Sequence, residues 1–225
     1  MFRTIVWRYR YPELYDDSEA HRRIEDLARD LSGRRIAVVG NAQSLFDFQD
    51  GSVIDGHDVV VRLNRGVVFQ PKSQGQRTDM VGISCPMSWK EVQEGFGTPK
   101  LIWLSPIREL MAADLVRKRM EMAWVPFDTW RELKGQLGQG RPSSGLIILY
   151  ALKMAFEPSA ISLFGFDWKA SRTSYHDNAQ HVREMSKTWH NWDVERRIVQ
   201  SWTRGEPVIR IYPLEKHFAA SGLVQ

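Results

Sequence analysis

The sequence predicts a single three-layer α/β domain with a largely parallel sheet, and two observations support this fold class. Short, uninterrupted apolar runs recur along the chain, which is the pattern of strands buried on both faces of a parallel sheet. Helical patterns separate several of these runs, which indicates alternating strands and helices. The chain has 225 residues, enough for one domain with a sizeable apolar core. We therefore expect one Rossmann-like domain.

The N-terminal part predicts one clear element, a charged helix from Ser18 to Leu31. Ile24, Leu27 and Ala28 lie on one side of this helix, and Gly33 follows its end. We expect the helix to pack outside the core. For the preceding tract from Arg3 to Arg10 we expect a strand or a packed tail.

The remaining elements follow from the apolar runs. Strands are predicted at residues 36–39, 59–61, 80–83, 101–104, 161–164 and 208–211, and helices at 109–122, 146–156 and 192–202. The stretch from Gly135 to Gly140 is interpreted as a mobile loop entering the site, with an ordinary surface turn as the alternative.

Charge and cysteine content limit the class of protein. The chain carries 31 Lys and Arg against 27 Asp and Glu, a net charge of +4. This mild excess suits an anionic substrate or contact with anionic lipid, and it is too diffuse to argue for nucleic acid. Cys85 is the single cysteine, so we expect no internal disulfide and a reduced, cytoplasmic location.

The first ten residues contain no apolar region long enough for a signal peptide or a membrane span. Phe2, Ile5, Val6 and Trp7 lie among arginines in this segment. A short aromatic and basic amphiphile of this kind could rest on a membrane surface. We therefore include a peripheral contact at the inner membrane face as an expectation.

Polar residues follow the first two strands, where ligands of open α/β sheets bind. The first turn, Gly40-Asn41-Ala42-Gln43-Ser44, lacks the glycine spacing of a dinucleotide fold and the Gly-Lys-Ser/Thr of a P-loop. Asn41 and Ser44 can still bind a sugar or phosphate, although Asn41 could simply cap the turn. Asn64 follows the next strand and is expected at the same rim.

Ser143, Ser144 and Gly145 follow a proline and open an apolar helix. The free N–H groups and positive dipole end of such a helix suit a phosphate or carboxylate. The alternative is that Ser143 is merely an N-cap. We interpret the Ser-Ser-Gly tip as a binding element.

Acid and base candidates come late in the chain, at His176, His190 and Glu195. If Asn191 caps the last helix, Glu195 lies on its buried side, where a carboxylate needs a donor partner or stays protonated. A structural anchoring role for Glu195 is therefore as reasonable as a chemical one. His190 would precede the cap, where the helix dipole keeps an imidazole neutral and able to accept a proton.

These motifs, in this order, resemble glycosyltransferase family 29, the eukaryotic-type sialyltransferases. Residues 36–41 through 54–65 resemble the large sialylmotif, and residues 142–145 through 163–166 resemble the small one. His176 with Asp177 is similar to the third motif, and His190 with Glu195 to the very small motif. The matches cover about residues 35 to 195, and their combination is more specific than any single one.

The resemblance implies a GT-A-like fold and an inverting, metal-independent transfer of a sialic acid from its CMP-activated form to the hydroxyl of a glycan or glycolipid acceptor. No cofactor is expected, because the CMP-sugar is a co-substrate. No metal is expected either, because the transfer that the resemblance implies is metal-independent. Asn41, Ser44, Asn64, Ser143, Ser144, Gly145 and Glu195 would form the donor site. By the same resemblance, His176 would donate to the departing phosphate, and His190 would be the general base. Residues 1–33 are then an N-terminal extension with a helix, and residues 34–225 the catalytic domain.

The sequence departs from the family at several positions. Ile36 occupies the first cysteine position of the disulfide that usually links the large and small motifs of the family, and Ser44 stands where the family often has a second asparagine. The membrane anchor and stem of the Golgi enzymes are not seen, so we expect a bacterial-type, soluble or peripheral version. Three alternatives stay open: a CMP-Kdo-dependent transferase, a bacterial sialyltransferase of another lineage, and a non-catalytic nucleotide- or nucleic-acid-binding module.

Overall fold

A seven-stranded sheet forms the centre of the computed structural model, which describes residues 2–174 and 189–213. The strands are β1 (Arg35–Val39), β2 (Val59–Leu63), β3 (Met80–Ile83), β4 (Lys100–Trp103), β5 (Ala123–Trp124), β6 (Ala160–Phe164) and β7 (Val208–Ile211). Their order is β5-β4-β3-β2-β1-β6-β7, and every neighbouring pair is parallel. The predicted α/β class with a mostly parallel sheet is confirmed.

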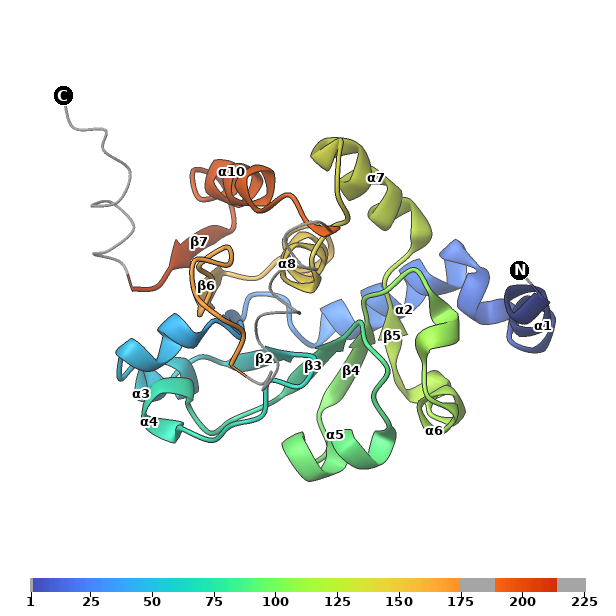
Figure 1. Cartoon of the computed structure of the whole chain (residues 1–225), viewed down its shortest axis with the longest axis horizontal. Coiled ribbons are helices and arrows are strands. Elements are labelled where there is room, and N and C mark those ends of the chain that lie inside the picture. The colour runs from blue at the N-terminus through green and yellow to red at the C-terminus, as the bar shows by residue number, and fades with distance from the viewer. Residues whose placement is uncertain (1, 175–188, 214–225) are drawn as a thin grey trace.

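Helices cover both faces of the sheet (Figure 1). The α-helices are α1 (Phe2–Arg10), α2 (Asp17–Arg29), α3 (Gly51–Asp55), α4 (Pro71–Gln74), α5 (Trp89–Phe96), α6 (Ala113–Arg117), α7 (Phe127–Leu137), α8 (Ser144–Ala155) and α10 (Trp192–Trp202). Short 3-10 turns lie at η1 (Pro12–Tyr15), η2 (Gln43–Asp47), η3 (Arg108–Leu110) and η4 (Arg119–Glu121).

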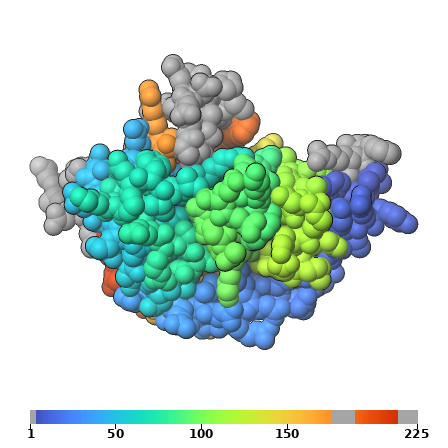
Figure 2. Space-filling view, turned by 90° about the horizontal axis from the view of Figure 1, so that it is seen from below, coloured from blue at the N-terminus to red at the C-terminus, as the bar shows by residue number. Residues whose placement is uncertain are grey.

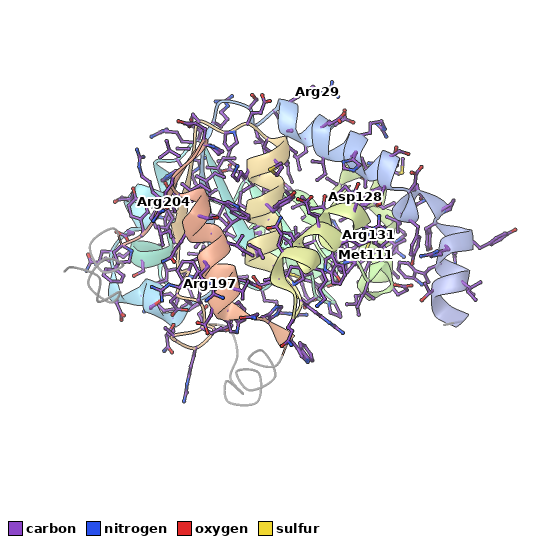
Figure 3. The ribbon with its side chains drawn as sticks, turned by 90° about the horizontal axis from the view of Figure 1, so that it is seen from above. Arg29, Met111, Asp128, Arg131, Arg197 and Arg204 are labelled. Carbon is purple, nitrogen blue, oxygen red and sulfur yellow. The ribbon has the colours of Figure 1, made fainter. Side chains whose placement is uncertain are left out.

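The alternation of strand side chains divides the core between the two faces. Val38, Val61 and Leu163 point to the face covered by α2, α7, α8 and α10. Seen from that side, α8 lies between α10, which carries Arg197, and α7, which carries Asp128 and Arg131 (Figure 3). Val81 and Trp103 belong to the opposite face, and Figure 2 shows that face covered by α3, α4, α5 and α6.

The strand predictions were accurate, and the central runs are buried on both faces, whereas β7 is an edge strand with Val208 and Arg210 exposed. Three other segments differ from the predicted secondary structure. Residues 109–122 do not form one helix, because the chain bends at Met111, whose side chain is buried in the core. The tract from Arg3 to Arg10 belongs to the helix α1 and is not a strand, and its Trp7 packs against the core, as expected for a packed tail. The predicted loop from Gly135 to Gly140 begins inside α7, which ends at Leu137.

The helix predicted at Ser18 to Leu31 exists as α2, but it does not pack outside the core. Ile24 and Ala28 are buried in the same apolar cluster as β1 and β2. The buried guanidinium of Arg108 donates to the carbonyl oxygen of Leu14 at 3.1 Å and to that of Val125 at 2.6 Å. The first thirty residues are thus joined to the sheet, while the predicted boundary after residue 33 stays a prediction.

Within residues 2–174 and 189–213, no helix has both the length and the apolar character needed to cross a bilayer. The predicted contact of the N-terminus with a membrane surface stays a prediction.

Candidate active site

A cavity of about 430 Å³ opens at the carboxyl ends of the central strands. Its lining comes from six segments: the turn after β1, the end of β2, the residue after β3, the start of α8, the loop after β6 and the segment that begins α10. The sheet grows away from β1 in two directions, through β2 on one side and β6 on the other. The cavity therefore lies at the topological switch point, where open α/β sheets bind ligands.

The turn after β1 brings Asn41 into the cavity wall. At Gly40 the turn passes so close to the loop after β6 that an added Cβ would lie 2.5 Å from the carbonyl oxygen of Gly165. Asn41 donates its side-chain N–H to the carbonyl oxygen of Leu63 at 2.9 Å, which ties the turn to the end of β2. Asn41 thus connects two strands of the rim.

Asn64 follows β2 and sits at the centre of a small polar network. Its backbone has φ of 51°, a left-handed conformation that asparagine tolerates better than most residues. Its side-chain oxygen accepts from the backbone N–H of Ser84 at 2.8 Å, and its amide nitrogen donates to Ser144 Oγ at 3.3 Å. The hydroxyls of Ser84 and Ser144 are 2.6 Å apart. The network holds Asn64 and Ser144 side by side in the wall.

Ser84 also lines the cavity, and sequence reasoning missed it. It comes directly after β3, so the rule that selected Asn41 and Asn64 would have found it.

The tip of α8 faces the cavity through Ser143, Ser144 and Gly145. Ser143 is the N-cap, and its hydroxyl accepts the backbone N–H of Leu146 at 3.1 Å. N–H groups of a first helical turn have no acceptor within the helix, and the dipole places partial positive charge there. The N-cap role of Ser143 therefore leaves the tip suited to an anionic ligand, and the binding role predicted for it stays a prediction.

Glu195 anchors the start of α10 to the tip of α8. Only 2% of the residue is exposed. Its two carboxylate oxygens accept from the backbone N–H of Ser143 at 2.8 Å and from Ser143 Oγ at 2.5 Å. Burial raises the pKa of Glu195 to about 7, although these two hydrogen bonds favour the anion. Of the two roles considered for Glu195, the contacts favour anchoring.

His190 lies in the cavity wall with one ring nitrogen already engaged. Its Nδ1 is 2.6 Å from the carbonyl oxygen of Arg141. A carbonyl only accepts, so Nδ1 carries the hydrogen and Nε2 keeps its lone pair. The ring lies against Trp192, with centroids 4.8 Å apart. Nε2 is thus the atom of His190 able to take a proton.

The pKa of His190 lies below its usual value. Burial is the main cause, and the hydrogen bond to the Arg141 carbonyl opposes it only in part. The positive charges of Lys169 and Arg141 lower the pKa further. The sequence predicts a neutral imidazole from the helix dipole, whereas burial is the largest cause of the lowered pKa in the structure.

The backbone before α10 is fixed by the loop after α7. The backbone N–H of Arg141 donates to the carbonyl oxygen of Trp189 at 2.6 Å. At Gly140 an added Cβ would lie 3.0 Å from the backbone nitrogen of Asn191. The segment after α7 therefore contacts the backbone on both sides of His190, although no residue of the predicted loop from Gly135 to Gly140 lines the cavity.

Two predicted site residues, Ser44 and His176, are not among the described residues that line this cavity. Ser44 does not line this cavity, so its grouping with Asn41 and Asn64 is wrong. The 3-10 turn η2 carries Ser44 to a neighbouring cavity of about 260 Å³, where its hydroxyl donates to Asp167 Oδ2 at 2.9 Å. His176 and Asp177 lie outside the described residues.

The loop after β6 contributes residues that sequence reasoning did not select. Phe166, Asp167, Trp168 and Lys169 all line the cavity. Their position directly after a strand was the available signal, as it was for Ser84.

Comparison with known proteins connects this arrangement to one family. The profile of glycosyltransferase family 29 (sialyltransferase) matches residues 18–126. A CMP-N-acetylneuraminate-beta-galactosamide-alpha-2,3-sialyltransferase 1 from Gallus gallus is 28% identical over 195 residues, covering 75% of this chain and 55% of the relative. The chain thus spans about half the length of the curated relatives that it matches.

Solved structures share the fold at low sequence identity. A mammalian sialyltransferase in complex with Gal-beta-1-3GalNAc-ortho-nitrophenol superposes with a TM-score of 0.56 at 17% identity, covering 88% of this chain and 79% of that one. The sialyltransferase CstII from Campylobacter jejuni, in complex with the substrate analogue CMP-3FNeuAc, gives a TM-score of 0.54 at 13% identity and covers 83% of each chain.

Proposed function

This chain belongs to glycosyltransferase family 29, the sialyltransferases, and on that premise we propose that it transfers a sialic acid from a CMP-activated donor to a hydroxyl of an acceptor glycan. One observation carries the proposal. A helix N-terminus and a histidine whose Nδ1 is held by a carbonyl, which leaves the lone pair on Nε2, face one cavity at the switch point of the sheet. The first suits a leaving phosphate and the second an attacking hydroxyl.

The donor nucleotide is assigned to the wall formed by Asn41, Asn64 and the tip of α8. Amide groups of the two asparagines can bind the cytidine portion. The N–H groups of Ser144 and Gly145 can bind the phosphate, whose negative charge grows as it leaves. Glu195 contributes indirectly, because it fixes Ser143 and with it the helix tip.

His190 is assigned as the general base of an inverting displacement. The acceptor oxygen forms a bond to the anomeric carbon of the sialic acid while the bond from that carbon to the phosphate oxygen breaks. The electron pair of the broken bond leaves with CMP, and the acceptor proton moves to His190 Nε2. Attack opposite the leaving group inverts the anomeric centre.

Metal independence is part of the proposal. Protein donors around the phosphate can supply the stabilisation that a cation supplies in other glycosyltransferases. CMP-Kdo is retained as an alternative donor, because the residues assigned to the nucleotide do not recognise the sugar. The profile match and the curated relatives favour sialic acid.

The transfer reaction provides the first test. The purified chain, incubated with CMP-sialic acid and a β-galactoside in the presence of EDTA, is expected to release CMP and form the sialylated acceptor. CMP-Kdo is expected to react at least tenfold more slowly, which is the scale of discrimination that a sugar pocket provides. If the chain turned over neither CMP-sialic acid nor CMP-Kdo, the proposal would be wrong. Turnover that EDTA abolishes and Mg²⁺ restores would remove its metal-independent part.

A further inference from the structure

Lys169 is a cation in the cavity wall that the mechanism above does not use. It lies in the loop after β6, and its backbone has φ of 66°, next to Trp168 with φ of 50°. Two consecutive non-glycine residues in the left-handed region are costly, and such strain concentrates at functional sites. The loop therefore presents Lys169 in a conformation that the chain adopts at a cost.

Asp167 holds this loop in place without neutralising the ammonium group. Its Oδ1 accepts from the backbone N–H of Lys169 at 3.0 Å. Its Oδ2 accepts from the backbone N–H of Ser171 at 2.9 Å and from Ser44 Oγ at 2.9 Å. The carboxylate is thus engaged by backbone and hydroxyl donors, which explains why Ser44 points away from the main cavity.

The Lys169 ammonium group has only neutral partners in the described part of the chain. Nζ donates to Thr173 Oγ1 and lies 5.7 Å from the centre of the Trp192 ring. Among residues 2–174 and 189–213, no carboxylate oxygen lies within 4 Å of Nζ. Burial lowers the pKa of Lys169, with the charge of Asp167 opposing it. A half-buried cation without a counter-ion is unfavourable unless a ligand supplies the negative charge.

The anionic group that would pair with the Lys169 ammonium group belongs to the CMP-sugar donor. Lys169 lines the same cavity as Ser144, Gly145 and His190, and its charge acts on the His190 ring. A CMP-sugar of the proposed kind carries a phosphate and a carboxylate close together around the reacting carbon. An ammonium group at this position would pair with negative charge that increases on the phosphate during transfer.

We propose that Lys169 is a catalytic residue whose ammonium group binds the anionic centre of the CMP-sugar donor and stabilises the departing phosphate. The inference rests on the proposed function, and it adds the positively charged group that pairs with the anionic donor. The face of Trp192 and the hydroxyl of Thr173 hold the ammonium group in position for this contact.

Calorimetric binding of CMP and of cytidine tests this assignment without requiring turnover. In Lys169→Gln, which keeps a hydrogen-bonding side chain, the Kd for CMP is expected to rise about tenfold or more, the usual effect of losing a charge-assisted hydrogen bond. The Kd for cytidine is expected to stay unchanged, which also reports that the variant is folded. Lys169→Arg is expected to retain most of the affinity for CMP.

Lys153→Gln is the matched control, because the ammonium group of Lys153 also donates to a neutral oxygen, the carbonyl of Glu206 at 3.4 Å, but lies in the last turn of α8. It should bind CMP as the unmodified chain does.

The same titration with CMP-3FNeuAc separates the two anionic groups of the donor. Weaker binding of both ligands to Lys169→Gln supports a phosphate contact. Weaker binding of the sugar nucleotide alone would place the ammonium group at the carboxylate and would overturn its assignment to the departing phosphate. Unchanged affinity for both ligands in Lys169→Gln overturns the inference and leaves the proposed function standing. An unmodified chain that binds neither ligand would instead count against the proposed function itself.

Discussion

His190→Ala is expected to reduce the transfer rate about a hundredfold or more, the usual contribution of a general base, while CMP binds with unchanged affinity. The expectation follows from the roles of the two ring nitrogens. Nδ1 is engaged by the Arg141 carbonyl at 2.6 Å, so the imidazole is held in one tautomer and only Nε2 can take the acceptor proton. Steady-state rates with saturating donor, together with calorimetric CMP binding, measure the two effects separately.

The pH dependence of the unmodified chain belongs to the same test. Because burial lowers the pKa of His190, the base is present at neutral pH. The acid limb of kcat/KM should therefore fall below the ordinary histidine value of about 6.5.

His57→Ala is the matched control for this variant. His57 also has its Nδ1 at a backbone carbonyl, that of Val53 at 2.8 Å, but it lies after α3 and outside the cavity. It should retain full activity. A His190→Ala protein with normal transfer, or one that loses CMP binding as well, would contradict the assignment of His190 as base.

Glu195→Gln is expected to remove a pH dependence of stability that the unmodified chain shows. The pKa of Glu195 is about 7 in the folded chain, against about 4.5 for the free group. The folded state thus binds the proton more tightly than the unfolded state does. The stabilisation is complete below about pH 4.5 and is lost as the pH rises through 7.

The expected size of the effect is about 3 kcal/mol, which follows from the difference between the two pKa values. Urea unfolding at pH 5 and pH 8 measures it, as the loss of stability in the unmodified chain minus the loss in Glu195→Gln. The glutamine can keep hydrogen bonds to Ser143, so the comparison isolates ionisation from the loss of contacts.

Glu94→Gln provides the control for other titrating groups. Glu94 lies on α5 with its side chain 66% exposed, in an ion pair with Lys90, and its replacement should leave the pH profile of stability unchanged. If the unmodified chain and Glu195→Gln show parallel profiles between pH 5 and pH 8, Glu195 is not the group whose burial sets this dependence.

The central part of the sheet was predictable from the sequence because its strands are buried on both faces. Ile36 to Val39 and Ile161 to Phe164 read as continuous apolar runs, and the structure has strands at both. β5 was missed because it contains only two residues. Residues 109–122 were predicted as one helix, but Asp114 Oδ2 accepts the backbone N–H of Trp89 at 2.8 Å. Long-range contacts such as this one override local periodicity and cannot be read from spacing.

The cavity was predictable to the extent that each residue follows a strand or opens a helix. Asn41, Asn64 and Ser143 meet in space because parallel strands end at one edge of the sheet. The direction in which a side chain points inside a turn could not be predicted in this way. Ser44 lies only three residues after Asn41, but η2 directs it to Asp167. The surroundings of Lys169 were also not predictable, because the lack of a carboxylate beside its ammonium group among the described residues is a property of the folded chain.

A crystal structure with CMP bound tests the central claim most directly. We predict density for CMP in the 430 Å³ cavity, with a phosphate oxygen about 3 Å from the N–H groups of Ser144 and Gly145, as in a hydrogen bond. His190 Nε2 should face the space where the sugar and acceptor would meet. CMP bound in the neighbouring cavity beside Ser44, or bound with its phosphate away from the tip of α8, would contradict the account.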